Sequence, residues 1–144
     1  MAQSPRLKIS SSSVGKLKDK IRSLTTGHST KSVEATIREL TPVLRGWISY
    51  FRRTQIKGVL EELDGWIRRK LRCLLWRQWK RPSTRVRMLM KAGLEENRAK
   101  KSAYNHYGPW RNAGASHMNQ AYRKRWFEKL GLVSLLECHQ QFQR

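Results

Sequence analysis

The chain has 144 residues, which suffice for one sizeable core or two small ones but are too few for a complete polymerase or a large α/β enzyme. Its 31 Lys and Arg outnumber its 10 Asp and Glu, which gives a formal net charge of +21. Such a charge favours nucleic acid over an anionic membrane as the partner, because a basic surface that meets phosphates releases their counterions.

The sequence also indicates the cellular location of the protein. No stretch approaches the roughly 20 apolar residues that cross a bilayer, and the opening MAQSPRLKISSSS lacks the apolar run of a secretory signal. Cys73 and Cys138 are too few and too far apart in sequence to indicate a disulfide framework, which fits a reducing compartment. We expect a cytoplasmic protein without a membrane partner, in which Cys73 is a small buried apolar residue.

The first part of the chain is polar and basic. Residues 1–12 show no hydrophobic periodicity and end in a serine run, so we interpret them as a linker or a cut edge. A helix is predicted from Ser13, with a serine cap at its start and Gly27 at its end. Its apolar stripe consists of Val14, Leu17, Ile21 and Leu24.

Two further helices are predicted before Pro82. One begins at a Ser32 cap and continues to Phe51, with a kink expected at Pro42 because proline removes a backbone donor. The other covers residues 59–81. Three helices with short connections favour an antiparallel three-helix bundle over residues 13–81.

The third helix carries two different faces. Steps of three and four place apolar side chains on one face, which should meet a core; they are Leu60, Leu63, Ile67, Leu71 and Leu74. The opposite face collects Arg68, Arg69, Arg72, Trp76, Trp79 and Lys80. Cations interleaved with indoles suit RNA, whose phosphates attract cations and whose bases stack on aromatic planes. The alternative is a solvated basic face whose two Trp are buried against the C-terminal half.

Residues 82–144 are predicted to form a smaller helical region. A short helix capped by Ser83 or Thr84, a turn at Gly93 and a helix over residues 95–103 resemble a helix-turn-helix only superficially. Glycine and proline punctuate the aromatic residues of 104–115, so a loop is expected there. A helix capped by Ser116 and a last apolar segment complete the region.

Two more groups of residues are candidates for binding. A basic run straddles Pro82 and is expected to contact phosphate rather than to form only a solvated surface; it consists of Lys80, Arg81, Arg85, Arg87 and Lys91. The 104–115 loop carries Tyr104, Asn105, His106, Tyr107, Trp110, Arg111 and Asn112. These side chains suit base stacking and base-edge contacts, and suit equally well the filling of a second small core.

Residues for catalysis are missing. Polymerases need clustered carboxylates to hold two metal ions, and the only aspartates, Asp19 and Asp64, lie on different predicted helices. No Cys and His spacing suits zinc, and no phosphate-binding glycine loop occurs. His117, at the start of a predicted helix, is expected to be a cap-region residue or to make a polar contact rather than to act as a base. The chain alone is therefore predicted not to be an enzyme and to need no cofactor.

Several motifs together resemble a known family. They are RGWISYFRRTQ, with its Gly46-Trp47-x-x-Tyr50-Phe51 element, and the Asp64-x-Trp66-Ile67-Arg68 element that follows. These residues resemble the maturase-specific domain, also called domain X or the thumb, of bacterial group II intron-encoded proteins. GPWRNAGASHMNQAY and LGLVSLLE are similar to the C-terminal tail of many members. The likeness covers about residues 10–140.

The resemblance implies a helical thumb that binds group II intron RNA and assists splicing and mobility. Fingers, palm and the Tyr-x-Asp-Asp metal motif are missing, so the chain resembles the C-terminal fragment of an RNA-directed DNA polymerase without its active site. A separate palm and fingers polypeptide is a possible partner. The alternatives are a module that contacts target DNA during intron insertion through the segment after Pro82, or a non-functional remnant of a mobile element.

Overall fold

The protein is all-α. The computed structural model describes residues 9–26, 31–53 and 56–144, and every regular element within these ranges is a helix. In chain order they are α1 (Ser11–Thr25), α2 (Val33–Tyr50), α3 (Lys57–Gln78), α4 (Pro82–Lys91), α5 (Glu96–Ala103), α6 (Pro109–Ala113), α7 (Ser116–Ala121), α8 (Lys124–Lys129) and α9 (Leu135–Gln143).

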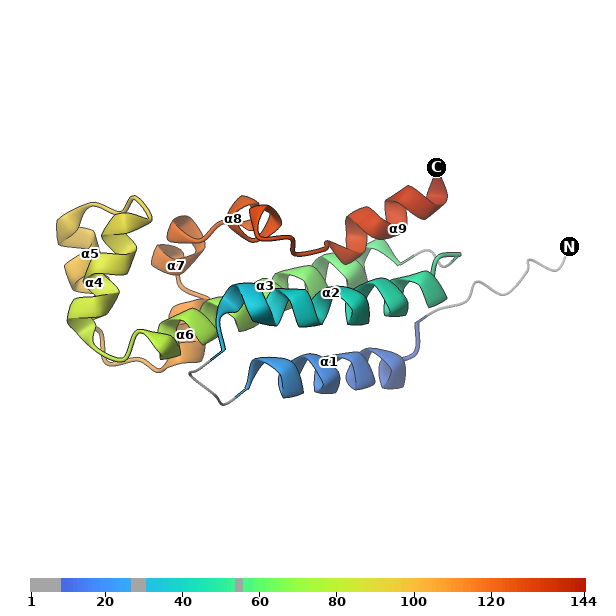
Figure 1. Cartoon of the computed structure of the whole chain (residues 1–144), viewed down its shortest axis with the longest axis horizontal. Helices are drawn as coiled ribbons and strands as arrows, with labels where there is room; N and C mark the ends of the chain where they lie inside the picture. The colour runs from blue at the N-terminus through green and yellow to red at the C-terminus, as the bar shows by residue number, and fades with distance from the viewer. Residues whose placement is uncertain (1–8, 27–30, 54–55) are drawn as a thin grey trace, which may run out of the picture.

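The first three helices lie lengthwise beside one another and alternate in direction, as their short connections and matching apolar stripes favoured (Figure 1). The apolar stripes meet between them: Ile21, Leu44 and Leu60 are all fully buried. Ser32 caps α2 by accepting the backbone N–H of Ala35 at 3.1 Å, also as expected. The first helix begins earlier than predicted, with Ser10 as its cap, and α2 continues through Pro42 without a break. The expected Gly27 cap lies outside the described residues.

The segment after α3 forms a helical hairpin. Pro82 occupies the first turn of α4, where its missing N–H has no partner to lose, so the expected cap at Ser83 or Thr84 is not formed. Gly93 has φ of 105° and makes the turn to α5, as expected. In Figure 1 this hairpin stands across the end of the bundle.

The helices from α6 onward pack along α3. The segment expected to be a loop contains the short helix α6, which lies against α3, while α9 packs on both α2 and α3. The helix expected from Ser116 is divided into α7 and α8, because Tyr122 (φ −122°, ψ 79°) and the extended Arg123 (φ −75°, ψ 166°) leave the helical conformation. Buried side chains from the bundle and from the later helices form one continuous apolar core.

No helix among the described residues is both long and apolar enough to cross a lipid bilayer.

Candidate nucleic-acid interface

The residues predicted to face outward from α3 do not all do so. Trp76, Trp79 and Arg72 are only 1%, 5% and 6% exposed. The expectation that these three side chains point toward solvent is wrong. The alternative, in which the indoles are buried against the C-terminal half, describes them correctly.

A ladder of aromatic rings explains this burial. Trp76 packs on Trp79 with ring centroids 6.2 Å apart, and Trp79 packs on Tyr122 at 5.5 Å. Tyr122 continues to Trp126 at 4.8 Å, and Trp126 to Phe127 at 5.1 Å. The ladder runs from the C-terminal end of α3 to α8, so the second face of α3 is a packing face rather than a free one.

Arg72 is bound inside the protein. Its Nε donates to the backbone carbonyl of Tyr122 at 2.8 Å, and its guanidinium lies 5.3 Å from the ring of Phe127. Burial, with the nearby charge of Arg68, lowers the pKa of Arg72 to about 10, so the side chain still carries its charge at neutral pH. Arg72 thus fixes Tyr122, between α7 and α8, to α3.

Arg69 and Arg85 also make internal contacts. Arg69 donates through Nε and Nη2 to the carbonyl of Trp110 at 3.1 and 2.9 Å, and its guanidinium lies 4.0 Å from the centre of that indole. Arg85 stacks at 4.6 Å on the ring of Trp76 and donates to the Trp76 carbonyl at 3.3 Å. Both side chains therefore help to hold helices together.

The other predicted site residues remain accessible. Lys80, Arg81 and Arg87 are exposed around the α3–α4 junction, and Arg68 is half-buried on α3. Arg111 is exposed on α6, with its guanidinium 3.5 Å from the ring centre of Tyr107. None of these five forms an ion pair within the described part of the chain. The structure thus divides the predicted set between packing and solvent.

A second arrangement of cations and indoles was not identified from the sequence. Lys18 Nζ, Arg22 Cζ and Lys70 Nζ lie 5.3, 5.4 and 5.5 Å from the centre of the Trp66 ring. Lys70 also lies 5.4 Å from the ring of Trp110, which Arg69 covers from α3. We call this group the Trp66–Trp110 surface; it comprises Lys18, Arg22, Trp66, Arg69, Lys70 and Trp110. It joins α1, α3 and α6.

The Trp66–Trp110 surface is strongly positive. An aromatic ring attracts a cation without cancelling its charge, so these contacts fix the cations and leave them able to bind an anion. Asp19 is the one acid that pairs with them among the described residues, at 2.9 Å from Arg22. The pKa of Lys70 is lowered, mainly by burial and further by Arg22 and Arg77, against an opposing effect of Cys73. An anion placed here would relieve that repulsion.

Part of this surface can be predicted from residue spacing along two helices. Lys18 and Arg22 are four residues apart on α1, as are Trp66 and Lys70 on α3, so each pair shares a helix face. Which faces meet depends on the packing of α1 against α3. Trp110 comes from α6, whose position the periodicity did not specify.

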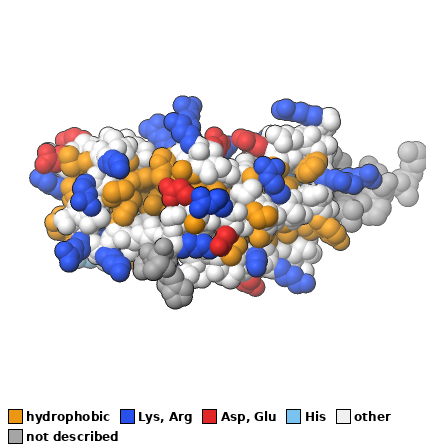
Figure 2. Space-filling model, viewed as in Figure 1, with side chains coloured by type: hydrophobic (Ala, Val, Ile, Leu, Met, Phe, Trp, Pro, Cys, Tyr) orange, Lys and Arg blue, Asp and Glu red, His pale blue; other side chains and the backbone are white. Residues whose placement is uncertain are grey.

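Lys and Arg also dominate the wider surface. Figure 2 shows their side chains spread over the visible face, with fewer Asp and Glu among them. Charge alone therefore does not single out one site. The Trp66–Trp110 surface differs from the rest because three cations from two helices gather around one indole, that of Trp66.

The loop amides have a structural role. Asn112 is buried and donates to the carbonyls of Tyr107 and Gly108 at 2.9 and 3.0 Å, and it bonds the side chain of Asn105. His117 Nε2 lies 3.0 Å from Asn112 Oδ1, which confirms the predicted polar contact. Residues 104–115 were expected either to contact bases or to fill a small core, and the burial of Asn112 agrees with the second interpretation.

Acidic and metal-binding side chains do not gather into one site among the described residues. Asp19 is exposed on α1, whereas Asp64 is buried on α3 and hydrogen-bonded to the start of α9. Cys73 is buried, as expected, and burial raises the pKa of its thiol. Across the described ranges, no three His, Cys, Asp or Glu side chains gather closely enough to hold a metal ion.

The comparisons with known proteins identify the chain through its helical bundle. A search of curated proteins gave no match. The profile of the family described as "Group II intron, maturase-specific domain" matches residues 14–93, which is more than half of the chain. The match begins in α1 and ends at the Gly93 turn, so it includes the bundle, α4 and most of the Trp66–Trp110 surface. The chain belongs to the group II intron maturase-specific domain family.

Proposed function

We propose that this protein is an RNA-binding maturase, or thumb, module that binds group II intron RNA and thereby assists splicing and mobility. The observation that carries the proposal is the Trp66–Trp110 surface, where cations from two helices, α1 and α3, are held on two indoles. It lies largely within the residues that match the family.

The phosphate backbone is the proposed ligand of this surface. Lys18 and Lys70 form no ion pair within the described residues, and Arg22 pairs with Asp19 through Nη1 alone, so all three side chains keep N–H donors for phosphate. Trp66 restricts their positions, so less side-chain entropy is lost when phosphate binds. Cations already lie over the rings of both indoles, which favours phosphate contacts over base stacking at this surface. The exposed cations Arg68, Lys80, Arg81, Arg87 and Arg111 are proposed to extend the contact with RNA.

No polymerase activity is proposed for this chain. The family is a maturase-specific domain and not a polymerase active site. We propose that the chain corresponds to the C-terminal part of a group II intron reverse transcriptase, acting in the cytoplasm, and that a palm and fingers polypeptide is a partner.

A salt titration tests the proposal. Affinity is measured for a group II intron RNA, an unrelated structured RNA of equal length and a duplex DNA. The salt concentration is varied between roughly 50 and 200 mM, a range over which affinity that depends on phosphate contacts falls strongly. We expect the intron RNA to be preferred at physiological salt. Equal affinity for the three ligands would leave only charge attraction, and preference for the duplex would indicate the DNA-contacting alternative.

A matched pair of variants locates the contact. The variant with Lys18, Arg22 and Lys70 replaced by Gln should bind the intron RNA more weakly, with a salt slope that is shallower by roughly two to three units. The control variant has Arg38, Arg45 and Arg53 replaced by Gln, which removes the same amount of charge. These three residues are exposed on α2 or just after it. If both variants lose affinity equally, the Trp66–Trp110 surface is not the RNA contact.

A further inference from the structure

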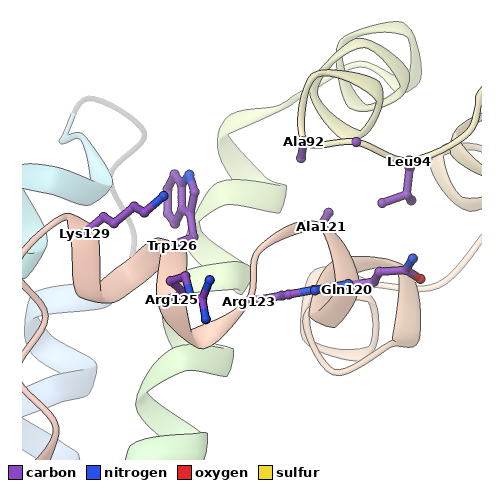
Figure 3. Close-up of a pocket in the computed structure, with 9 residues that line it drawn as sticks. Ala92, Leu94, Gln120, Ala121, Arg123, Arg125, Trp126 and Lys129 are labelled. Atoms are coloured by element: carbon purple, nitrogen blue, oxygen red, sulfur yellow. The ribbon is translucent and has the colours of Figure 1, made fainter.

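A cavity of about 300 Å³ opens between the α4–α5 turn and the α7–α8 segment. In Figure 3 the turn that carries Ala92 and Leu94 lies across the cavity from Trp126 and Arg125. Its lining consists of Ala92, Gly93, Leu94, Gln120, Ala121, Arg123, Arg125, Trp126 and Lys129. Most of these residues lie beyond the segment that matches the family.

The cavity is positively charged. Arg123, Arg125 and Lys129 are exposed, and no acidic residue lines the cavity with them. None of the three forms an ion pair within the described ranges, whereas Lys124 on the same short helix pairs with both Glu128 and Glu137. The acids of this region thus pair with Lys124, which does not line the cavity, and leave the three cations that line it available to an anion.

Trp126 is the aromatic wall of this cavity. Tyr122 and Phe127 contact its ring edge to face, with interplanar angles of 85° and 89°, so the orientation of the indole is fixed from within. The ring remains half-buried and also borders an adjoining cavity of about 530 Å³, with which the first shares Ala92 and Ala121. A planar ligand ring could therefore stack on the fixed indole of Trp126 from the open side of the cavity.

Gln120 adds a directional polar group. Its Oε1 accepts a hydrogen bond from Arg98, which orients the amide and leaves its N–H₂ group as a donor. The cavity thus combines three cations, one indole and one amide donor within a volume at the lower end of the small-ligand range.

We propose that this cavity binds one unpaired nucleotide of a polynucleotide strand, with the base against Trp126 and the flanking phosphates on Arg123, Arg125 and Lys129. A paired base stays within its helical stack and cannot reach the indole, so the site selects single-stranded segments. The inference goes beyond the proposed maturase function, because it concerns a different surface and does not require intron RNA.

Short oligonucleotides test the stacking directly. Affinity of the full chain is measured by fluorescence anisotropy for labelled oligouridylate, for an oligomer of equal length and charge that lacks bases, and for a blunt duplex. We expect the base-containing strand to bind about fivefold or more tightly than the abasic strand, as one base–aromatic stack allows. Equal affinity of these two strands would overturn the proposal. Oligothymidylate, run in parallel, shows whether the site takes RNA, DNA or both.

Variants at Trp126 separate the site from general charge. Trp126→Leu should reduce binding of the base-containing strand to the level of the abasic strand, while Trp126→Phe should keep most of the difference. Poor folding would weaken both strands together, so the ratio between them reports stacking even if Trp126→Leu is less stable. A ratio that is unchanged in Trp126→Leu would contradict the assignment.

Charge variants and a cross-link complete the test. Arg123→Gln with Arg125→Gln should weaken both strands to a similar degree, and more than Arg38→Gln with Arg45→Gln does. A strand with 5-iodouridine should cross-link to the peptide that contains Trp126, and cross-links confined to other peptides would exclude this cavity. Because none of these measurements uses intron RNA, their failure is distinct from failure of the maturase proposal.

Discussion

Asp64 on α3 accepts the backbone N–H of Leu135 at 2.8 Å and so caps α9 across 71 residues of sequence. Its second oxygen accepts the Ser134 hydroxyl at 2.8 Å and the N–H of Leu136 at 3.1 Å. A carboxylate at the first turn of a helix satisfies free amides and interacts favourably with the helix dipole. The motif that first indicated the family thus contains the residue that attaches the C-terminal helix to the bundle.

Replacement of Asp64 tests this attachment. Asp64→Asn keeps the shape but replaces one accepting oxygen by an NH₂ group, which leaves a buried donor without an acceptor. We expect a loss of about 1–3 kcal/mol in the free energy of unfolding, measured with urea. Asp19→Asn, at an exposed position on α1, is the control and should change stability by less than about 0.5 kcal/mol. Equal effects of the two changes would mean that the cap contributes nothing.

The buried Arg72 gives a prediction that separates packing from charge. Arg72→Ala removes both the hydrogen bond to Tyr122 and the contact with Phe127, and should cost about 1.5–3 kcal/mol of stability. Arg72→Met keeps most of the volume and removes the buried charge, so it should cost less. The half-buried Arg68 is the comparison, because Arg68→Gln should change RNA affinity rather than urea stability. If Arg72→Ala were stable but bound RNA more weakly, Arg72 would be an RNA-binding residue rather than a packing residue.

Dependence of the bundle on the C-terminal helices is testable by truncation. A fragment of residues 9–93 retains the part matched by the family but loses Tyr122, His117 and α9, which contact Arg72, Trp76 and Asp64, respectively, in the full chain. We expect it to be helical without a cooperative urea transition, as followed by far-UV and near-UV circular dichroism. A cooperative transition like that of the full chain would support residues 13–81 as an independent domain.

The buried His117 predicts a change of stability with pH. Burial, and then the charge of Arg98, lowers the pKa of His117 below its usual value of 6.5. In the unfolded chain this imidazole takes up a proton as the pH falls through about 6.5, while in the folded protein it does so only at lower pH. The stability present above pH 6.5 should therefore decrease between that pH and the lower folded pKa.

Urea unfolding at pH 7.5 and pH 5.5 measures this difference. The change between the two pH values should shrink in His117→Asn, which cannot titrate, and should persist in a variant of the exposed His106. If His117→Asn keeps the whole pH dependence, other groups are responsible for it.

The three long helices, the Ser32 cap, the Gly93 turn and the buried leucine stripe of α3 were predictable from the sequence, because each depends on residues close together in the chain. Periodicity of 3.6 residues places Leu60 and Leu63 on one face whatever packs there. The motifs around Trp47 and Trp66 also sufficed to indicate the family that the comparison then showed.

Only the tertiary structure decided the use of the other faces. Sequence spacing put Arg72, Trp76 and Trp79 on a common face, but α7 and α8 cover that face, so the predicted binding residues became packing residues. Conversely, Trp66 and Trp110 come together with Lys18 only because α1 and α6 both pack on α3. A helical period determines which residues share a face, whereas long-range packing determines whether that face meets protein or solvent.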